Sequence, residues 1–364
     1  MNAATARRAR SSAVRLLVVD GSGHIHHRTH RDLPSLLRPG DLVVANDAAT
    51  LPASLTGVHL PTGADIEVRL AGHLIAGTAP VTRFTGILFG SGDYRTPTEH
   101  RPSPPAMHVG DGLLIASLNA RVVQVNQHPR LIALAFEEPA AAVWEGLSRR
   151  GRSIQYAHVA RPLALWDTWT SIAARPVAFE PPSAGFVLDW SMLGDLRRRG
   201  VRFATLTHAA GISSTGDPEL DARLPFDEPY FIPSSTATLI ELTKEGGGRV
   251  IAIGTTVVRA LEHSARETGH VAAGHDVATG RIEPGTRIQI VDAIVSGVHE
   301  PGTSHNSLLR TFQDTDAIER MWHEAESRGY LAHEFGDAVL IIRRDAMRCD
   351  TDETSSHQLA VHLC

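Results

Sequence analysis

A segment that begins at Gly254 with the sequence GTTVVRALE combines residue types that bind anionic or hydroxylated ligands. The apolar run before it predicts a buried strand, and the periodicity after it predicts a helix. Ligands of open α/β sheets bind beyond the carboxyl ends of strands, where a helix N-terminus offers free N–H groups. Thr255 or Thr256 would cap this helix and face a ligand, or would only cap it, and the spacing leaves both open. Arg259 and Glu262, one turn apart, are expected to form a surface pair.

A second polar loop follows the apolar run IQIVDAIVS and contains His299, Glu300 and His305. This spacing differs from the HExxH motif of metalloproteases, because residues six apart do not share a helix face and Pro301 and Gly302 break a helix. No metal site is predicted here. A histidine in such a loop can act as a general base near neutral pH, or it can be structural or solvated.

Three further segments place small residues beside polar ones, which lets a backbone approach a ligand closely. They are PPSAGF (181–186), THAAGISST (207–215) and HEFGDA (333–338). None of them is a GxSxG nucleophile elbow, and no GxGxxG or GxxxxGK[ST] motif occurs. These absences weigh against a serine hydrolase, a dinucleotide dehydrogenase and a P-loop NTPase.

The elements that must position these segments differ between two parts of the chain. Residues 51–139 contain short apolar segments separated by Gly, Pro and Asn turns, which indicates a sandwich or small barrel with an exposed proline-rich loop at 95–112. Elsewhere helices and strands alternate, which implies parallel strands with helical crossovers. Helices are expected at 140–150, 190–199, 234–245, from 255, from 307 and at 316–328, and strands at 13–20, 41–44, 201–208, 249–254, 288–296 and 337–342.

We therefore expect a mixed α/β protein with an insertion. A discontinuous α/β catalytic domain would comprise residues 1–50 and 140–364, and an all-β, barrel-like domain would occupy residues 51–139. The 364 residues suffice for two such domains, at roughly 150 residues per domain. No internal repeat is visible.

Composition narrows the setting of the protein. The two cysteines, Cys349 and Cys364, make no disulfide framework and no CxxC zinc motif, so a reducing cytoplasm is the simplest location. No apolar run reaches the roughly 20 residues that span a bilayer. The Arg-rich N-terminus raises the possibility of a transit peptide, but VRLLVVD reads directly as a first strand. The net charge of -5 argues against sequence-blind nucleic-acid binding, although it leaves room for a local basic patch.

Several segments, in their order along the chain, resemble the S-adenosylmethionine:tRNA ribosyltransferase-isomerase family of the queuosine pathway. The strongest match is GTTVVRALE, and the others are RPGDLVVANDAATLPASL, PSAG, EPYFIP from Glu228, DAIVSGVHEPGTSH and HEFGDAVLI. Together they cover most of the chain, and their shared order is more specific than any one motif. The family's architecture is an α/β domain interrupted by a β-barrel domain, which agrees with the insertion inferred above.

The resemblance implies a reaction that transfers and isomerises the ribosyl part of S-adenosylmethionine. The acceptor would be the aminomethyl group of a 7-deazaguanine base in the anticodon loop of tRNA, and the products epoxyqueuosine, adenine and methionine. Such chemistry needs a base beside the sulfonium, an acid for adenine departure and a neutral amine. By resemblance, His299 is the base candidate, and Asp337 or Glu228 orients groups or relays protons.

The resemblance also implies the ligands and their contacts. S-adenosylmethionine is expected as co-substrate and tRNA as the default acceptor, with no metal and no membrane, in a cytoplasmic monomer. Thr255, Thr256 and Arg259 would hold ligand hydroxyls or the methionine carboxylate. The full set of expected substrate-binding residues is Ser183, Gly185, His208, Gly254, Thr255, Thr256, Arg259, Glu300 and Glu334.

The chain departs from the family at several polar positions. Where the family reads NxTRV, it has residues 46–49 (NDAA); where the family reads TAGLHF, it has 183–188 (SAGFVL). LHVGAGTF becomes 206–213 (LTHAAGIS), and Phe226 replaces a histidine just before Glu228. The pattern suits a divergent branch. Two alternatives are therefore ribosyl transfer to a small acceptor other than tRNA, and a catalytically inactive nucleoside-binding paralogue.

Overall fold

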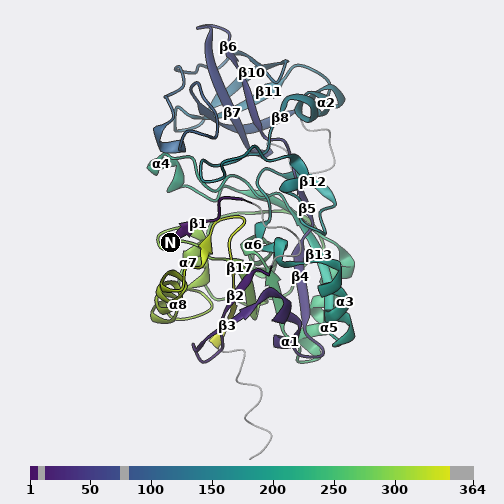
Figure 1. Ribbon diagram of the computed structural model, residues 1–364. Coiled ribbons are helices and arrows are strands. Elements are labelled where there is room, and N and C mark those ends of the chain that lie inside the picture. Colours follow the sequence, from purple (N-terminus) through teal and green to yellow (C-terminus); the bar gives the residue numbers. More distant parts are fainter. Residues whose placement is uncertain (7–12, 74–81, 345–364) are drawn as a thin grey trace, which may run out of the picture.

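The computed structural model describes residues 1–6, 13–73 and 82–344, and Figure 1 shows that they form a barrel above a larger α/β part. Cys349, Cys364 and most of the Arg-rich N-terminal segment lie outside the described residues. The expected fold class, a mixed α/β protein with an inserted barrel, is confirmed.

The α/β part is built on one nine-stranded sheet. In spatial order its strands are β16 (Gly274–Ala278), β14 (Glu228–Ile232), β13 (Arg202–His208), β4 (Leu42–Asn46), β15 (Val250–Ile253), β17 (Ala293–Gly297), β19 (Ala338–Ile342), β2 (Arg15–Val19) and β3 (Ile25–Thr29). The four central strands β13, β4, β15 and β17 are parallel. The expected parallel strands thus form the centre of the sheet, and β14, β16, β19 and β3 each join an antiparallel pair.

Side chains of this sheet pack on both faces, which explains its near-continuous apolar strands. In β4, Leu42 and Val44 contribute to one core, whereas Val43 and Ala45 contribute to the other. Helices α5 (Ser234–Glu245), α6 (Thr255–Ala265) and α8 (Thr315–Ser327) contribute to the first core, and α1 (Leu33–Leu36) and α3 (Trp190–Arg198) to the second. The sheet is therefore a rigid layer between helices, and its strand ends are fixed positions for a site.

The inserted part is a closed antiparallel barrel. Its strands, in spatial order, are β10 (Leu118–Val125), β11 (Leu131–Phe136), β8 (Arg83–Phe89), β7 (Ala64–His73), β6 (Ser54–His59) and β9 (Gly112–Ile115). Along β10, Leu118, Ala120 and Val122 alternate inward. Helix α2 (Ala140–Arg150) packs Val143 and Leu147 into the barrel core, so this packing extends beyond the boundary expected at residue 139.

The remaining elements are short. They are β1 (Asn2–Ala3), β5 (Ala48–Thr50), β12 (Arg175–Ala178), β18 (Leu331–Ala332), α4 (Pro218–Asp221), α7 (Ser304–Leu309) and the 3-10 turns His30–Asp32, Thr98–His100, Leu165–Asp167 and Ser183–Val187. Two expected boundaries are wrong: α7 begins at Ser304 instead of Ser307, because Thr303 caps it, and β17 begins at Ala293 instead of Ile288, because the backbone N–H groups of 289–291 donate to Glu262.

The segment 95–112 lies between two barrel strands, as expected, but it is not an exposed loop throughout. Thr98, Arg101 and Met107 are buried. Arg101 forms an ion pair with the buried Glu67 and donates to the carbonyl of Gly90 at 2.9 Å. The guanidinium group therefore fastens the loop to the barrel, which proline content alone does not reveal.

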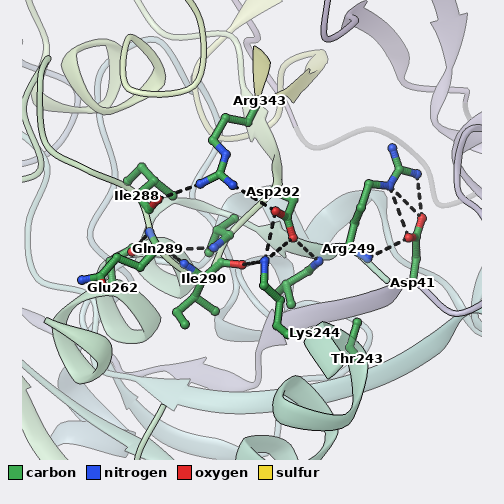
Figure 2. A network of polar contacts seen from close by, with 12 residues as sticks. Asp41, Thr243, Lys244, Arg249, Glu262, Ile288, Gln289, Ile290, Asp292 and Arg343 are labelled. Carbon is green, nitrogen blue, oxygen red and sulfur yellow. Dashed lines mark hydrogen bonds and ion pairs between the residues drawn. The ribbon is translucent and has the colours of Figure 1, made fainter. Parts of the chain in front are cut away.

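A polar network fixes the strands at the edge where the parallel strands begin (Figure 2). Asp41 precedes β4 and pairs with Arg249, which precedes β15, with Oδ2 and Nη2 2.6 Å apart. Asp292, which precedes β17, accepts from Lys244 at 3.0 Å and Arg343 at 3.2 Å. These ion pairs fix the strand register at one edge of the sheet. The candidate site lies at the opposite edge.

Candidate functional site

The ends of six strands lie at the carboxyl edge of the parallel strands, on the side of the sheet that faces the barrel (Figure 1). β4, β13, β15 and β17 end here, and the antiparallel strands β14 and β19 begin here. The residues at these tips are Asn46, His208, Gly254, Gly297, Glu228 and Asp337. This is the crevice in which open α/β sheets bind ligands.

A cavity opens at this edge, and we call it the tip cavity. Its wall comes from the Ser183–Val187 turn, from the end of β17 at Ser296 and Gly297, and from residues 333–338 before β19. Of the expected site residues, Ser183, Glu334 and Asp337 line it. Gly254 adjoins its wall: the φ of this residue is 98°, and a Cβ there would lie 3.4 Å from Ala184 Cβ, so glycine suits both the backbone and the close approach.

Two histidines stack beside this cavity. The rings of His299 and His305 have centroids 4.4 Å apart and an interplanar angle of 16°. A Cβ on Gly297 would lie 3.5 Å from His299 Nε2, so the ring lies within van der Waals distance of the end of β17. Burial, followed by His305 and His333, holds the pKa of His299 well below its usual value. His299 is therefore neutral at pH 7 and has a lone pair that can accept a proton.

Another cluster of polar side chains comprises His158, His333 and Glu334. Glu334 Oε2 lies 3.0 Å from His158 Nε2, and the rings of His158 and His333 stack at 4.6 Å. Burial raises the pKa of Glu334, but the hydrogen bond and charge of His158 outweigh it and hold the pKa below its usual value. Glu334 is therefore an anion at neutral pH.

These three residues also have the ligand types of a metal site. One possible ligand atom from each lies within 4.8 Å of the others. In the present arrangement the rings of His158 and His333 stack, and Glu334 is bound to His158. The absence of a metal requirement stays a prediction.

A buried carboxyl group lies next to Glu334. Glu180 is 7% exposed, and the hydroxyl of Tyr156 donates to its Oε1 at 2.5 Å. Ser213, from the loop after β13, also hydrogen-bonds to Glu180. A smaller cavity, lined by Tyr156, Glu180 and Glu334, adjoins the tip cavity at Glu334 and Phe335. The expected ligand-approach segments 181–186, 207–215 and 333–338 thus converge.

Glu228, Arg259 and His208 form a buried network of polar contacts and do not line the tip cavity. Glu228 accepts from the backbone N–H of Gly211 at 2.5 Å and forms an ion pair with Arg259. Arg259 also donates to the carbonyls of Phe226, Ala278 and Gly280. The guanidinium is therefore occupied by protein groups and is not free to hold a ligand carboxylate. Burial raises the pKa of Glu228, and the Arg259 charge offsets this only in part.

His208 belongs to the same network and is fully buried. Asn46 holds its backbone: Asn46 Oδ1 accepts from His208 N–H and Nδ2 donates to His208 O, both at 2.9 Å. Burial and the nearby Arg259 hold the pKa of His208 well below its usual value. His208 thus lies behind the site as a neutral ring and does not line the tip cavity.

Asp337 lines the tip cavity, but its carboxylate is bound to the protein. Oδ2 accepts from Arg15 Nη2 at 2.7 Å and from Leu331 N–H at 3.0 Å, and Oδ1 accepts from Arg15 N–H at 3.0 Å. These contacts tie the start of β2 to the turn that carries His333 and Glu334. Asp337 therefore positions the cavity wall, and a proton relay through it is not supported by its geometry.

Two expectations about the segment after β15 are corrected. Neither Thr255 nor Thr256 caps α6, because Gly254 is the N-cap and no side chain bonds there. Thr256 Oγ1 accepts from Asn46 at 3.3 Å. Arg259 and Glu262 are not a surface pair: both are buried, and Glu262 accepts from the N–H groups of residues 289–291. Because helix α6 is itself buried, the side chains of Arg259 and Glu262 face the protein interior.

The remaining expected residues lie near the site without lining the tip cavity. Glu300 is exposed on the loop after β17, and Gly185 is buried against Thr170 in the Ser183–Val187 turn. The sequence interpretation missed Tyr156, His158 and Glu180. Glu180 has a usable signal, since it follows the apolar strand end VAF and precedes PPSAG. Tyr156 and His158 lie in an irregular segment with no periodic pattern.

One of the departures noted in the sequence, at residues 46–49, falls on structural positions. Ala48 and Ala49, which stand where the related family reads threonine and arginine, are buried in β5, which pairs with β12. Asp47 accepts from Thr205 at 3.1 Å and from Thr207 at 2.6 Å, so it joins β4 to β13.

Comparisons with known proteins agree with this architecture. Residues 1–341 match a family model described as "Queuosine biosynthesis protein". A relative from Geobacter metallireducens, named S-adenosylmethionine:tRNA ribosyltransferase-isomerase, is 32% identical and aligns over 91% of this chain and 94% of its own length. A relative of the same name from Thiobacillus denitrificans is 33% identical over 90% of each chain.

One solved structure has the same fold. The crystal structure of S-adenosylmethionine tRNA ribosyltransferase from Thermotoga maritima aligns with a TM-score of 0.50 and 24% identity, over 93% of this chain and 96% of that chain. Within the described residues, no helix has both the length and the apolar character needed to cross a membrane.

Proposed function

Because the chain belongs to the queuosine biosynthesis protein family, we propose that it is an S-adenosylmethionine:tRNA ribosyltransferase-isomerase. In this proposal it transfers and isomerises the ribosyl part of S-adenosylmethionine onto the 7-aminomethyl-7-deazaguanine base of tRNA, with release of adenine and methionine. The observation that carries the proposal is the convergence of the neutral His299 pair, the anionic Glu334 and the backbone of Gly297 beside one cavity.

His299 fits the role of the base that removes a proton beside the sulfonium. A base must hold a free lone pair when substrate arrives, and His299 is neutral because burial lowers its pKa well below 6.5. Its stacking partner His305 is also neutral, since burial and then Arg259 lower the pKa of His305 to about 4. A neutral His305 repels a protonated His299 less than a cationic neighbour would. His299 can therefore still accept a proton.

Glu334 and the cavity wall fit the cationic substrate. The sulfonium of S-adenosylmethionine carries a positive charge, and Glu334 supplies a carboxylate at the cavity surface. Opposite charges within about 4–6 Å stabilise each other strongly in a partly buried site. Ser183 and the backbone around Gly297 offer neutral hydrogen-bonding groups for ribose hydroxyls.

The direct test follows the products of S-adenosylmethionine. The purified protein is incubated with S-adenosylmethionine and one of three acceptors: tRNA that carries the deazaguanine precursor, the same tRNA with guanine at that position, or the free base. We expect adenine and methionine in equal amounts only with the precursor tRNA, together with a mass increase of that tRNA. Absence of adenine with every acceptor would contradict any ribosyl transfer and leave a nucleoside-binding protein.

A small acceptor is the second candidate, and two observations favour it. The net charge is -5, and the buried Ala49 stands in a segment where the related family carries an arginine. Binding of tRNA releases counterions, so its affinity should fall by about tenfold or more between 50 and 200 mM salt. An affinity for the acceptor that does not change with salt, with adenine release from the free base, would favour the small acceptor. The cytoplasmic location and the monomeric state stay predictions.

A further inference from the structure

Glu180 differs from the other buried acids in having neither an ion pair nor a set of three backbone N–H donors. Asp41, Glu67, Glu228, Asp292 and Asp337 each form an ion pair with arginine or lysine, and Glu262 accepts three backbone N–H groups. Within the described residues no ion pair involves Glu180, which is 7% exposed. Burial of an unpaired carboxylate is costly, so such a group takes up a proton.

Neutral donors surround this carboxyl group. The Tyr156 hydroxyl donates to Oε1 at 2.5 Å, and Ser213 bonds to the carboxyl group as well. Arg69 lies over the Tyr156 ring at 5.5 Å and forms its ion pair with Glu67. The other charged group that faces Glu180 is Glu334, a like charge. Within the described residues, none of these groups forms an ion pair with Glu180.

The environments of Glu180 and Glu334 push their protonation in opposite directions. Burial raises the pKa of Glu180 to about 7, although Tyr156 and Ser213 lower it, and the Glu334 charge raises it further. His158 keeps Glu334 ionised. Two adjacent carboxyl groups with separated pKa values are the arrangement that assigns acid and base roles in other enzymes. A pKa near 7 also suits a group that must give a proton and regain it.

We propose that Glu180, held as a carboxylic acid beside Glu334, is the general acid that protonates the departing adenine. This inference rests on the proposed function. In the step, the C1′–N9 bond of the adenosyl group breaks and its electron pair goes to adenine, while a lone pair of the ring oxygen O4′ forms a second bond to C1′ and gives an oxocarbenium. Adenine takes the proton of Glu180, which becomes a carboxylate. After adenine leaves, Glu180 regains a proton from solvent, so the enzyme returns to its starting state.

The substitution Glu180→Gln tests this role, because glutamine keeps the shape and the acceptor for Tyr156 but has no acid proton. General acid catalysis contributes about 10²–10⁴-fold. We expect the kcat for adenine release to fall by about 10²-fold or more, with the affinity for S-adenosylmethionine unchanged within about threefold. The matched control is Glu241→Gln, an exposed carboxylate on α5, which should keep the wild-type kcat.

The pH profile separates an acid from a structural group. The wild-type kcat should fall as pH rises through about 7, because Glu180 then loses its proton. This alkaline limb should vanish in Glu180→Gln. In Tyr156→Phe the limb should move to higher pH, since the tyrosine hydrogen bond stabilises the charged form of Glu180. Replacement of a group that only fills space would leave the alkaline limb unchanged.

A second readout does not depend on turnover. Because the pKa of Glu180 is raised in the fold, the wild type is stabilised at low pH and loses that stability between the unfolded value near 4.5 and about 7. The melting temperature of the wild type should therefore drop relative to Glu180→Gln between pH 5 and pH 8.

The outcomes distinguish the two proposals. A wild type that releases no adenine with any acceptor refutes the proposed function, and the acid role falls with it. An active wild type with an equally active Glu180→Gln, or with an alkaline limb that persists in that variant, refutes the acid role alone. A melting-temperature difference that is constant from pH 5 to pH 8 also refutes it, because Glu180 would then be ionised throughout.

Discussion

The imidazole of His208 and the carboxylate of Glu228 lie 3.6 Å apart, from Nε2 to Oε2, and neither reaches solvent freely. Arg259 pairs with the same carboxylate, and its charge adds to burial in keeping His208 neutral. The Arg259–Glu228 pair therefore carries the charge balance of this interior, and His208 is its uncharged neighbour. This relationship makes Arg259 a stability residue whose loss leaves a charge buried.

Replacement of Arg259 should destabilise the fold strongly. In Arg259→Ala, Glu228 would remain buried without a cation, and breaking a buried pair in this way costs about 3–5 kcal/mol. Urea unfolding at pH 7 measures the loss. Arg266→Ala, at the exposed end of the same helix, is the control and should change stability by less than about 0.5 kcal/mol. Equal losses of stability in the two variants would show that the buried Arg259–Glu228 pair stabilises the fold no more than an exposed arginine does.

Substitution of Asp337 should act through position and stability. Asp337→Asn removes the charge that binds Arg15 and two backbone N–H groups, and hydrogen bonds to charged groups contribute about 1.5–3 kcal/mol each. We expect a lower free energy of unfolding and a higher KM for S-adenosylmethionine, because the 333–336 turn would shift. Asp65→Asn, an exposed residue of the barrel, is the control. A kcat loss with unchanged stability and KM would instead indicate that Asp337 takes part in proton transfer.

The role of His299 as a base predicts a specific pH dependence of kcat. A base must be neutral, and the pKa of His299 lies well below 6.5 because of burial and the neighbouring histidines. On the acid side, the kcat should therefore not fall as pH drops from 7 to 6, and it should fall only at lower pH. His299→Gln should lose about 10²-fold or more in kcat, whereas His270→Gln, at an exposed position, should not. A wild-type acid limb centred near 6.5, or full turnover in His299→Gln, would remove His299 from the mechanism.

Sequence patterns were sufficient for the elements whose residues repeat regularly. The helix 234–245 and the strand at 202–208 follow their apolar periods, and the closed barrel follows from short strands and frequent turns. The strand ends predicted the edge at which the site lies. What periodicity does not contain is the partner of each polar side chain, so the inward orientation of Arg259 and Glu262 was missed.

The irregular segments carried the larger errors. Tyr156 and His158 lie between α2 and β12, where the backbone has no period, and their importance comes from contacts with Glu180 and Glu334 far along the chain. Asp337 was placed at the cavity correctly, but its binding to Arg15 joins residues 322 positions apart. Long-range pairs of this kind depend on the whole fold and leave no local pattern.

A strained backbone at His333 gives a further prediction. His333 has φ 69°, a left-handed conformation that costs a non-glycine residue about 1–2 kcal/mol. His333→Gly should keep or raise the free energy of unfolding but weaken binding of S-adenosylmethionine, because the cavity loses a ring stacked on His158. Gln127→Gly, at φ 34° in a barrel turn, should relieve strain without changing affinity. Tighter binding in His333→Gly would show that this ring is not part of the ligand surface.

The position of the bound nucleoside tests the central claim most directly. A crystal structure of the protein with S-adenosylhomocysteine, or with sinefungin, would show where this ligand lies. The account predicts that the ligand occupies the tip cavity, against Ser183, Gly297 and Glu334. A ligand bound instead at the opposite edge of the sheet, in the groove lined by Arg287 and Arg343, would contradict it.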